Sequence, residues 1–154
     1  MATMTVAQKQ EPGGDDVGQI FVTMKLTNAA DLDRIEDGLL APDQARHEAV
    51  AHTLVDTGAT HLSLPAVVIR RLGLKVDREV EAGTAAGVRT ARIFRNCLVE
   101  VGPRRTVAEV LELPEGVPAL LGALPMEAMG IEPDLKNRTL RFLPETGPGG
   151  FLFA

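Results

Sequence analysis

Turn-forming residues divide this chain into short segments, and the division restricts the folds that are open to it. Its 154 residues include 15 Gly and 10 Pro, and between them apolar and polar residues alternate with the period of a half-buried strand. Seven or eight such strands are expected, the first over residues 22–27 and the last over residues 139–143. Short strands without regularly alternating helices predict an all-β fold that is closed or nearly closed.

One or two short helices are expected among the strands. Pro65 suits the first turn of a helix over residues 66–72, and Gly73 would end that helix. A second helix over residues 125–129 would stop at Gly130. Helices this short cover part of a sheet and do not change the fold class.

The domain boundaries follow from composition. Residues 1–18 are polar and rich in glycine, which predicts a flexible tail. Residues 19–144 hold all the expected strands and are assigned to a single domain, because about 150 residues is the usual size of one domain. Residues 145–154 are predicted to form a second flexible tail, which ends in the apolar run Phe151-Leu152-Phe153.

The charge balance excludes several classes of partner. Sixteen Lys and Arg against 21 Asp and Glu give a net charge of −5, which argues against a nucleic-acid binder. No stretch has the apolar character of a membrane span or a signal peptide, and one cysteine cannot form an intramolecular disulfide. We therefore expect a cytoplasmic protein that binds neither nucleic acid nor membrane.

The strongest candidate for chemistry is the run Asp56-Thr57-Gly58-Ala59-Thr60. The apolar residues before it form a strand that delivers a carboxylate to a turn at the end of a sheet. Gly58 allows a tight bend there, and Thr57 and Thr60 offer hydroxyls and amides that could hold the carboxylate. An ordinary β-turn can also contain Asp-Thr-Gly, so the tripeptide alone does not indicate an active site. The residues on either side of it are needed for that interpretation.

With that context, the chain resembles the retropepsin-like aspartic proteases, and Leu135-Lys136-Asn137-Arg138-Thr139-Leu140 is similar to the closing segment of their bacterial branch. Leu54-Val55-Asp56-Thr57-Gly58-Ala59-Thr60 is similar to the active-site motif of the family. Gly83-Thr84-Ala85-Ala86-Gly87 falls where the family has its flap hairpin, and Leu120-Leu121-Gly122 is similar to its second signature. The resemblance covers about residues 21–143 and implies a closed β-barrel that is half of a pepsin-like bilobal enzyme.

The resemblance also implies an activity. A chain with one such aspartate would form a homodimer, in which Asp56 of each subunit meets at the two-fold axis and the pair activates a water that hydrolyses a peptide bond. Thr57, Gly58, Ala59 and Thr60 would support the loop and contact the second subunit. The substrate would be a peptide or protein, and neither a metal nor another cofactor is implied.

The flap is the point at which the sequence departs from the family. Relatives often carry an aromatic or large aliphatic residue near the tip, whereas Thr84-Ala85-Ala86 is small and leaves room for a larger substrate or a partner. This departure keeps a second reading open, in which the chain is a non-catalytic module that binds peptides or drives dimerisation and assembly.

Other candidates for chemistry are weaker. His47 and His52 are five residues apart, so they would lie on opposite faces of a strand and do not fit a zinc site. His61 is expected to be a partly exposed structural residue. The acidic residues near Asp31 lack the spacing of a calcium loop, and residues 28–44 are expected to be a solvated loop with at most one helical turn. Cys97 is expected to be a buried small hydrophobe.

Overall fold

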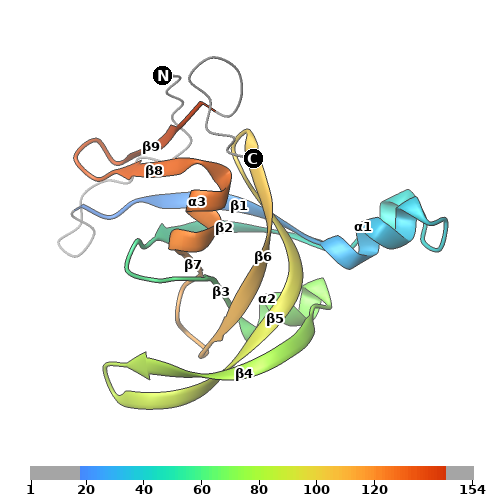
Figure 1. Cartoon of the computed structure of the whole chain (residues 1–154), viewed down its shortest axis with the longest axis horizontal. Helices are drawn as coiled ribbons and strands as arrows, with labels where there is room; N and C mark the ends of the chain where they lie inside the picture. The colour runs from blue at the N-terminus through green and yellow to red at the C-terminus, as the bar shows by residue number, and fades with distance from the viewer. Residues whose placement is uncertain (1–17, 145–154) are drawn as a thin grey trace, which may run out of the picture.

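The computed structural model describes residues 18–144 (Figure 1). Of the two predicted tails, 1–18 and 145–154, only Gly18 lies within the described residues, so the tails stay predictions. The described chain contains nine strands, three α-helices and one 3-10 helix, in the order β1 (Phe21–Asn28), α1 (Ala29–Glu36), η2 (Pro42–Gln44), β2 (His47–Val55), β3 (Leu62–Pro65), α2 (Ala66–Leu72), β4 (Lys75–Thr84), β5 (Gly87–Val101), β6 (Arg104–Leu113), β7 (Leu120–Leu121), α3 (Ala123–Met129), β8 (Ile131–Asp134) and β9 (Thr139–Phe142).

Seven strands form one sheet that closes on itself. Their order is β1-β2-β7-β3-β6-β5-β4, and an additional pairing of β1 with β5 completes a ring of the first six. Strand β4 lies outside the ring and pairs with β5 alone, so the β4–β5 hairpin extends away from the body of the molecule (Figure 1). The remaining two strands, β8 and β9, form a separate hairpin.

The predicted all-β single domain is therefore confirmed, with one correction to its shape. The closed sheet is a ring and not a regular barrel, because strand β7 contributes only two residues. A single residue pair, Ser63 with Leu120, joins β3 to β7, while β2–β7 and β3–β6 are parallel pairs within an otherwise antiparallel sheet. The described chain also has three α-helices where one or two were expected.

The interior of the ring is filled by apolar side chains from almost every element. Strand β1 alternates as its sequence predicts, with Val22, Met24 and Leu26 buried and Thr23 and Lys25 exposed. Helices α2 and α3 both end at glycines in the left-handed conformation, as expected. Each fully buried Leu, Ile or Met side chain stabilises the fold by about 1.5–3 kcal/mol, so the core holds the turns at the ends of the strands in place.

Strand β5 is longer than the sequence indicated. One strand runs from Gly87 to Val101, although Arg95 and Asn96 place two polar residues together in the middle of its sequence. A bulge in its pairing with β6 lies between Phe94 and Cys97, and Asn96 adopts a positive φ of 63° there. A bulge bends a strand without ending it, and the polar residues at the bend gave the appearance of a break.

The segment predicted as a solvated loop contains helix α1. Asn28 caps this helix: its side chain accepts a hydrogen bond from the Asp31 amide at 3.1 Å and donates one to the Leu72 carbonyl at 2.8 Å. Asp31 is buried, and both of its carboxylate oxygens accept hydrogen bonds at 2.9 Å from the guanidinium of Arg46. The interpretation of Asp31 as a solvated residue was wrong, because a cation 15 residues away in sequence compensates its burial.

Among the described residues, no helix has both the length and the apolar composition that crossing a bilayer requires.

The buried ion pair gives a pH-dependent prediction. The Arg46 guanidinium lowers the pKa of Asp31 from its ordinary 3.8 to about 2. A pKa depressed in the folded state stabilises the fold above the unfolded value, and that stabilisation is lost as the pH falls from about 4 to about 2. Asp31→Asn should lower the free energy of unfolding by about 1–3 kcal/mol at neutral pH and by less at low pH.

Urea denaturation of the wild type and the variant across this pH range measures the difference. The exposed Asp33→Asn, on the same helix, is the matched control and should change stability little. A deficit for Asp31→Asn that does not shrink on acidification would contradict the charge assignment.

Candidate active site

Asp56 directly follows the last residue of strand β2, and the pairing of that strand with β7 fixes its position. Leu54 and Val55 pair in parallel with Leu120 and Leu121. The Leu54 amide donates to the Ala119 carbonyl and the Asp56 amide to the Leu121 carbonyl, each at 3.0 Å. The Asp56-Thr57-Gly58 motif and the Leu120-Leu121-Gly122 motif are more than 60 residues apart in sequence, and this strand pairing brings them together at Asp56.

The carboxylate of Asp56 is held within its own turn. Its Oδ1 accepts a hydrogen bond from the Gly58 amide at 2.9 Å, and its carbonyl accepts one from the Ala59 amide at 3.2 Å. Among residues 18–144, neither the Thr57 nor the Thr60 hydroxyl donates to it, so the backbone fulfils the role expected of the threonines. Asp56 is partly exposed, and Thr57 and Gly58 are exposed, which leaves this turn accessible.

The residues after the turn are fastened to helix α3. The Ala123 amide donates to the Ala59 carbonyl at 2.8 Å and the Leu124 amide to the Thr60 carbonyl at 2.9 Å. Gly122 directly precedes helix α3 and lies against the backbone of the residues after the turn. A Cβ atom on Gly122 would come within 2.4 Å of the His61 carbonyl oxygen and 2.7 Å of the Ala59 carbonyl oxygen. The glycine of the second signature thus permits close backbone contact.

A large cavity separates this loop from the β4–β5 hairpin. Its volume is about 620 Å³, and its walls are mostly apolar. Of the predicted site residues, Ala59, Thr60, Gly83 and Leu120 line it. Ala85, Ala86 and Gly87 lie at the end of the hairpin and do not line the cavity, nor does Asp56, which lies three residues before Ala59.

Sequence reasoning did not find the other walls of this cavity. Val80 and Ala82 on β4 and Leu111 and Leu113 on β6 contribute apolar side chains. Residues two apart on a strand share a face, so the alternation was visible in the sequence. Nothing in the sequence distinguished a cavity wall from an ordinary core face, because that depends on how the hairpin and the β6–β7 connection lie together.

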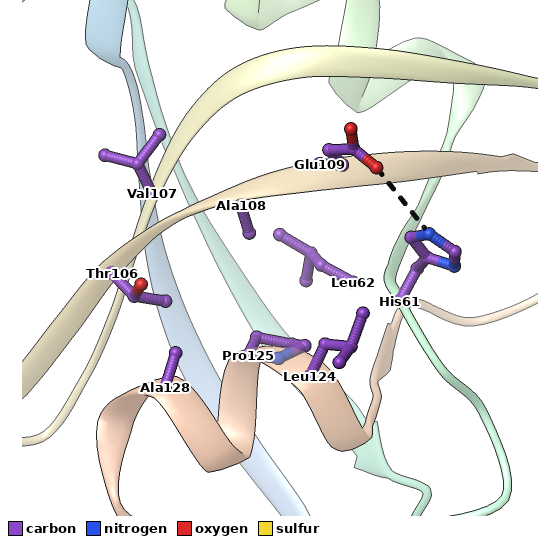
Figure 2. A pocket seen from close by; sticks show the side chains of 9 residues that line it. All are labelled: His61, Leu62, Thr106, Val107, Ala108, Glu109, Leu124, Pro125 and Ala128. Atoms are coloured by element: carbon purple, nitrogen blue, oxygen red, sulfur yellow. Dashed lines mark ion pairs between the residues drawn. The ribbon is translucent and has the colours of Figure 1, made fainter. Parts of the chain in front are cut away.

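His61 lines both this cavity and a second one, and Figure 2 shows the second. The second cavity, about 240 Å³, lies between strand β6 and helix α3, with Val107 on one side and Leu124 and Ala128 on the other. His61 Nε2 is 3.8 Å from Glu109 Oε2. Two hydrogen bonds from Arg78 lower the pKa of the Glu109 carboxyl. His61 therefore links the site loop to a network of charged residues.

The weaker candidates have structural roles. His52 stacks on Phe21, with ring centroids 4.1 Å apart, and has a positive φ of 62° beside a bulge in the β1–β2 pairing. Cys97 is fully buried, and burial raises its pKa to about 12. The interpretation of Cys97 as a small hydrophobe is therefore confirmed.

An all-β ring that presents an Asp-Thr-Gly turn near a large apolar cavity has the architecture of a retropepsin-like aspartic protease domain. Residues 47–124, about half of the chain, match the family described as "gag-polyprotein putative aspartyl protease". The chain belongs to this family, and the resemblance drawn from its motifs is confirmed. A comparison with curated proteins finds no match.

The contact at Gly122 gives a test of the loop architecture. Gly122→Ala should destabilise the protein by about 1–3 kcal/mol, the usual cost of forcing an extra carbon into a packed region. The φ of Gly122 is −92°, which alanine adopts readily, so the effect would be steric. Thermal denaturation measures it. Gly83→Ala, where an added Cβ meets nothing within 4 Å, is the control, and equal melting temperatures for the two variants would refute the close contact.

Proposed function

We propose that the protein is an aspartic endopeptidase in which two copies of the chain each supply Asp56. The observation that carries the proposal is the Asp56 turn itself: a partly exposed carboxylate, fixed by backbone bonds, near a 620 Å³ apolar cavity. Membership of an aspartyl protease family supports it. A cytoplasmic location is part of the same proposal.

The reaction requires a pair of carboxylates because each has a different task. Two carboxylates in contact do not both ionise, so the pair holds one proton. The ionised one takes a proton from a water molecule, whose oxygen attacks the carbonyl carbon of the peptide bond, while the other protonates the carbonyl oxygen. As the C–N bond breaks, the first carboxyl gives its newly acquired proton to the amine nitrogen, and the second takes a proton from a hydroxyl of the tetrahedral intermediate, which becomes the new carboxylic acid, so the pair again holds one proton.

The homodimer follows from the number of aspartates at such turns. The chain has one Asp-Thr-Gly run, and a two-fold axis brings identical turns together. The exposure of Thr57 and Gly58 at the end of the turn supports contact between the two copies there. In this arrangement Thr57 would donate its hydroxyl across the axis, and the β4–β5 hairpin would cover a bound peptide.

One observation favours a second function. The end of the β4–β5 hairpin is formed by the exposed small residues Ala85 and Ala86, which offer little surface to hold a peptide against the turn. A dimer that binds peptides or assembles without hydrolysing them fits this hairpin. The same assay separates the two functions, since both require the dimer and only one requires the carboxylate.

The central prediction concerns the carboxylate. Asp56→Asn should reduce peptide hydrolysis by at least about 10²–10⁴-fold, the usual contribution of general acid–base catalysis, because an amide cannot exchange the proton. The fold and the dimer should persist, since the side chains are nearly isosteric. The measurement is cleavage of a peptide library between acidic and neutral pH, with Asp43→Asn, on the exposed 3-10 helix η2, as the control.

Retained hydrolysis by purified Asp56→Asn would exclude the mechanism. If the wild type hydrolyses no peptide at any pH but still binds peptides as a dimer, the second function is correct.

The dimer contact has its own prediction. Thr57→Ala should raise the dimer dissociation constant by about tenfold or more, since an unpaired buried hydrogen-bond partner costs about 1–3 kcal/mol and the symmetry applies the loss twice. The fold of each subunit should be unchanged. Sedimentation equilibrium measures the constant, and Thr23→Ala, at an exposed position on β1, is the control. Equal dimer constants for the wild type and Thr57→Ala would remove Thr57 from the interface.

A further inference from the structure

A polar pocket lies at the end of strand β2 that is opposite to Asp56. Its volume is about 260 Å³, and four cationic side chains line it: Arg34, Arg46, Lys75 and Arg95. Asp31 supplies the only carboxylate in the lining. The chain has a net charge of −5 and only 16 Lys and Arg residues. Four of these cations line one small cavity, and they come from α1, β4, β5 and the segment before β2.

The floor of the pocket is rigid and electrically compensated. Arg46 binds both oxygens of Asp31 through Nε and Nη2, so the carboxylate is already neutralised by the first of the four cations. The Asn28 side chain joins the start of α1 to the end of α2, and the Asn28 amide donates to the Arg46 carbonyl at 2.9 Å. Within this network Asp31 accepts hydrogen bonds from Arg46 and not from Arg34, whose charge acts on the carboxylate only through space.

Gly73 provides room for the Arg46 guanidinium. A Cβ atom on Gly73 would lie 1.8 Å from Arg46 Nη1 and 2.4 Å from its Cζ, so the guanidinium lies directly against the glycine backbone. No side chain larger than hydrogen could occupy this position without displacing it. The Nη1 group, unlike Nε and Nη2, takes no part in the pair with Asp31.

The rim places like charges against each other. Lys75 and Arg95 are directly opposite across the β4–β5 pair, and like charges in that arrangement destabilise a sheet. Asp77 offsets part of the charge, with Oδ1 3.7 Å from Arg95 Nη1. Within the described chain, neither Lys75 nor Arg34 has a carboxylate within ion-pair distance. Arg34, Lys75 and Arg95 thus surround the opening of the pocket, and Asp77 compensates only part of their positive charge.

We propose that this pocket binds a phosphate group, either as free phosphate or as the phosphate of a phosphorylated polypeptide. A doubly charged anion matches a rim of three cations better than a carboxylate does, and guanidinium groups bind phosphate oxygens in pairs. Arg95 and Asn96 lie at the bulge of β5 and both line the pocket, and bulges are common beside binding sites. The site is independent of the proposed peptidase activity, since it lies at the other end of β2.

The test is an NMR titration of the full chain with inorganic phosphate at neutral pH and constant ionic strength. Amide shifts at Asp31, Arg46, Lys75 and Arg95 should move and saturate, while acetate produces weaker changes. Arg34→Gln combined with Lys75→Gln should weaken binding by about tenfold for each lost cation. Arg105→Gln combined with Lys136→Gln removes two exposed cations outside the pocket and should leave binding unchanged.

A thermal measurement keeps the proposal falsifiable if a variant folds poorly. Phosphate should raise the melting temperature of the wild type, because a ligand that binds only the folded state stabilises it, and the increase should be smaller in the pocket variant than in the control. A short phosphoserine peptide, compared with its serine form, separates the two sources: tighter binding than inorganic phosphate indicates a phosphorylated polypeptide, and binding of inorganic phosphate alone indicates the free anion. Shifts that do not saturate, or that are equal in the two double variants, would overturn the proposal.

Discussion

The parallel contact between strands β2 and β7 is the constraint on which the candidate site depends. It joins two residues of one strand to two of the other, yet it fixes both the Asp56 amide and the start of helix α3. Because β7 is so short, the backbone bonds from α3 to the Ala59 and Thr60 carbonyls and the absence of a side chain at Gly122 complete the attachment. The turn is therefore positioned by backbone geometry, and its side chains stay accessible, with Asp56 partly exposed and Thr57 exposed.

This dependence on local backbone geometry explains why the sequence was informative about the turn. Glycine at a sharp bend, an apolar strand before it and a second glycine after an apolar pair are short patterns with direct physical causes. Helix α2 is likewise predictable, since Pro65 and Gly73 mark its two ends. Strand β1 is predictable from the alternation of its apolar and polar residues, because one face of the strand is buried and the other is exposed to solvent. Each of these features is encoded within about ten residues.

The features that escaped prediction depend on residues that are distant in sequence. From its local sequence Asp31 is expected to be a solvated loop residue, and only its ion pair with Arg46, 15 residues away, explains its burial. Strand β8 is short, contains a proline, and pairs only with β9, so no alternation reveals it. The continuity of β5 through its bulge depends on pairing with β6. Local sequence patterns carry no information about which distant residues become neighbours when the ring closes. For the same reason, the sequence did not reveal the walls of the two cavities that His61 lines.

The two ends of β2 are electrostatically independent. Arg46 precedes the strand and Asp56 follows it, and the nine strand residues between them, interrupted by the bulge at His52, span up to about 30 Å. That distance is several times the screening length of about 8 Å at physiological salt, so the cations around Arg46 interact only weakly with charges at the Asp56 turn. Any effect of a phosphate in the pocket on hydrolysis would have to come from the position of a ligand that reaches both ends, and not from charge transmitted through the strand.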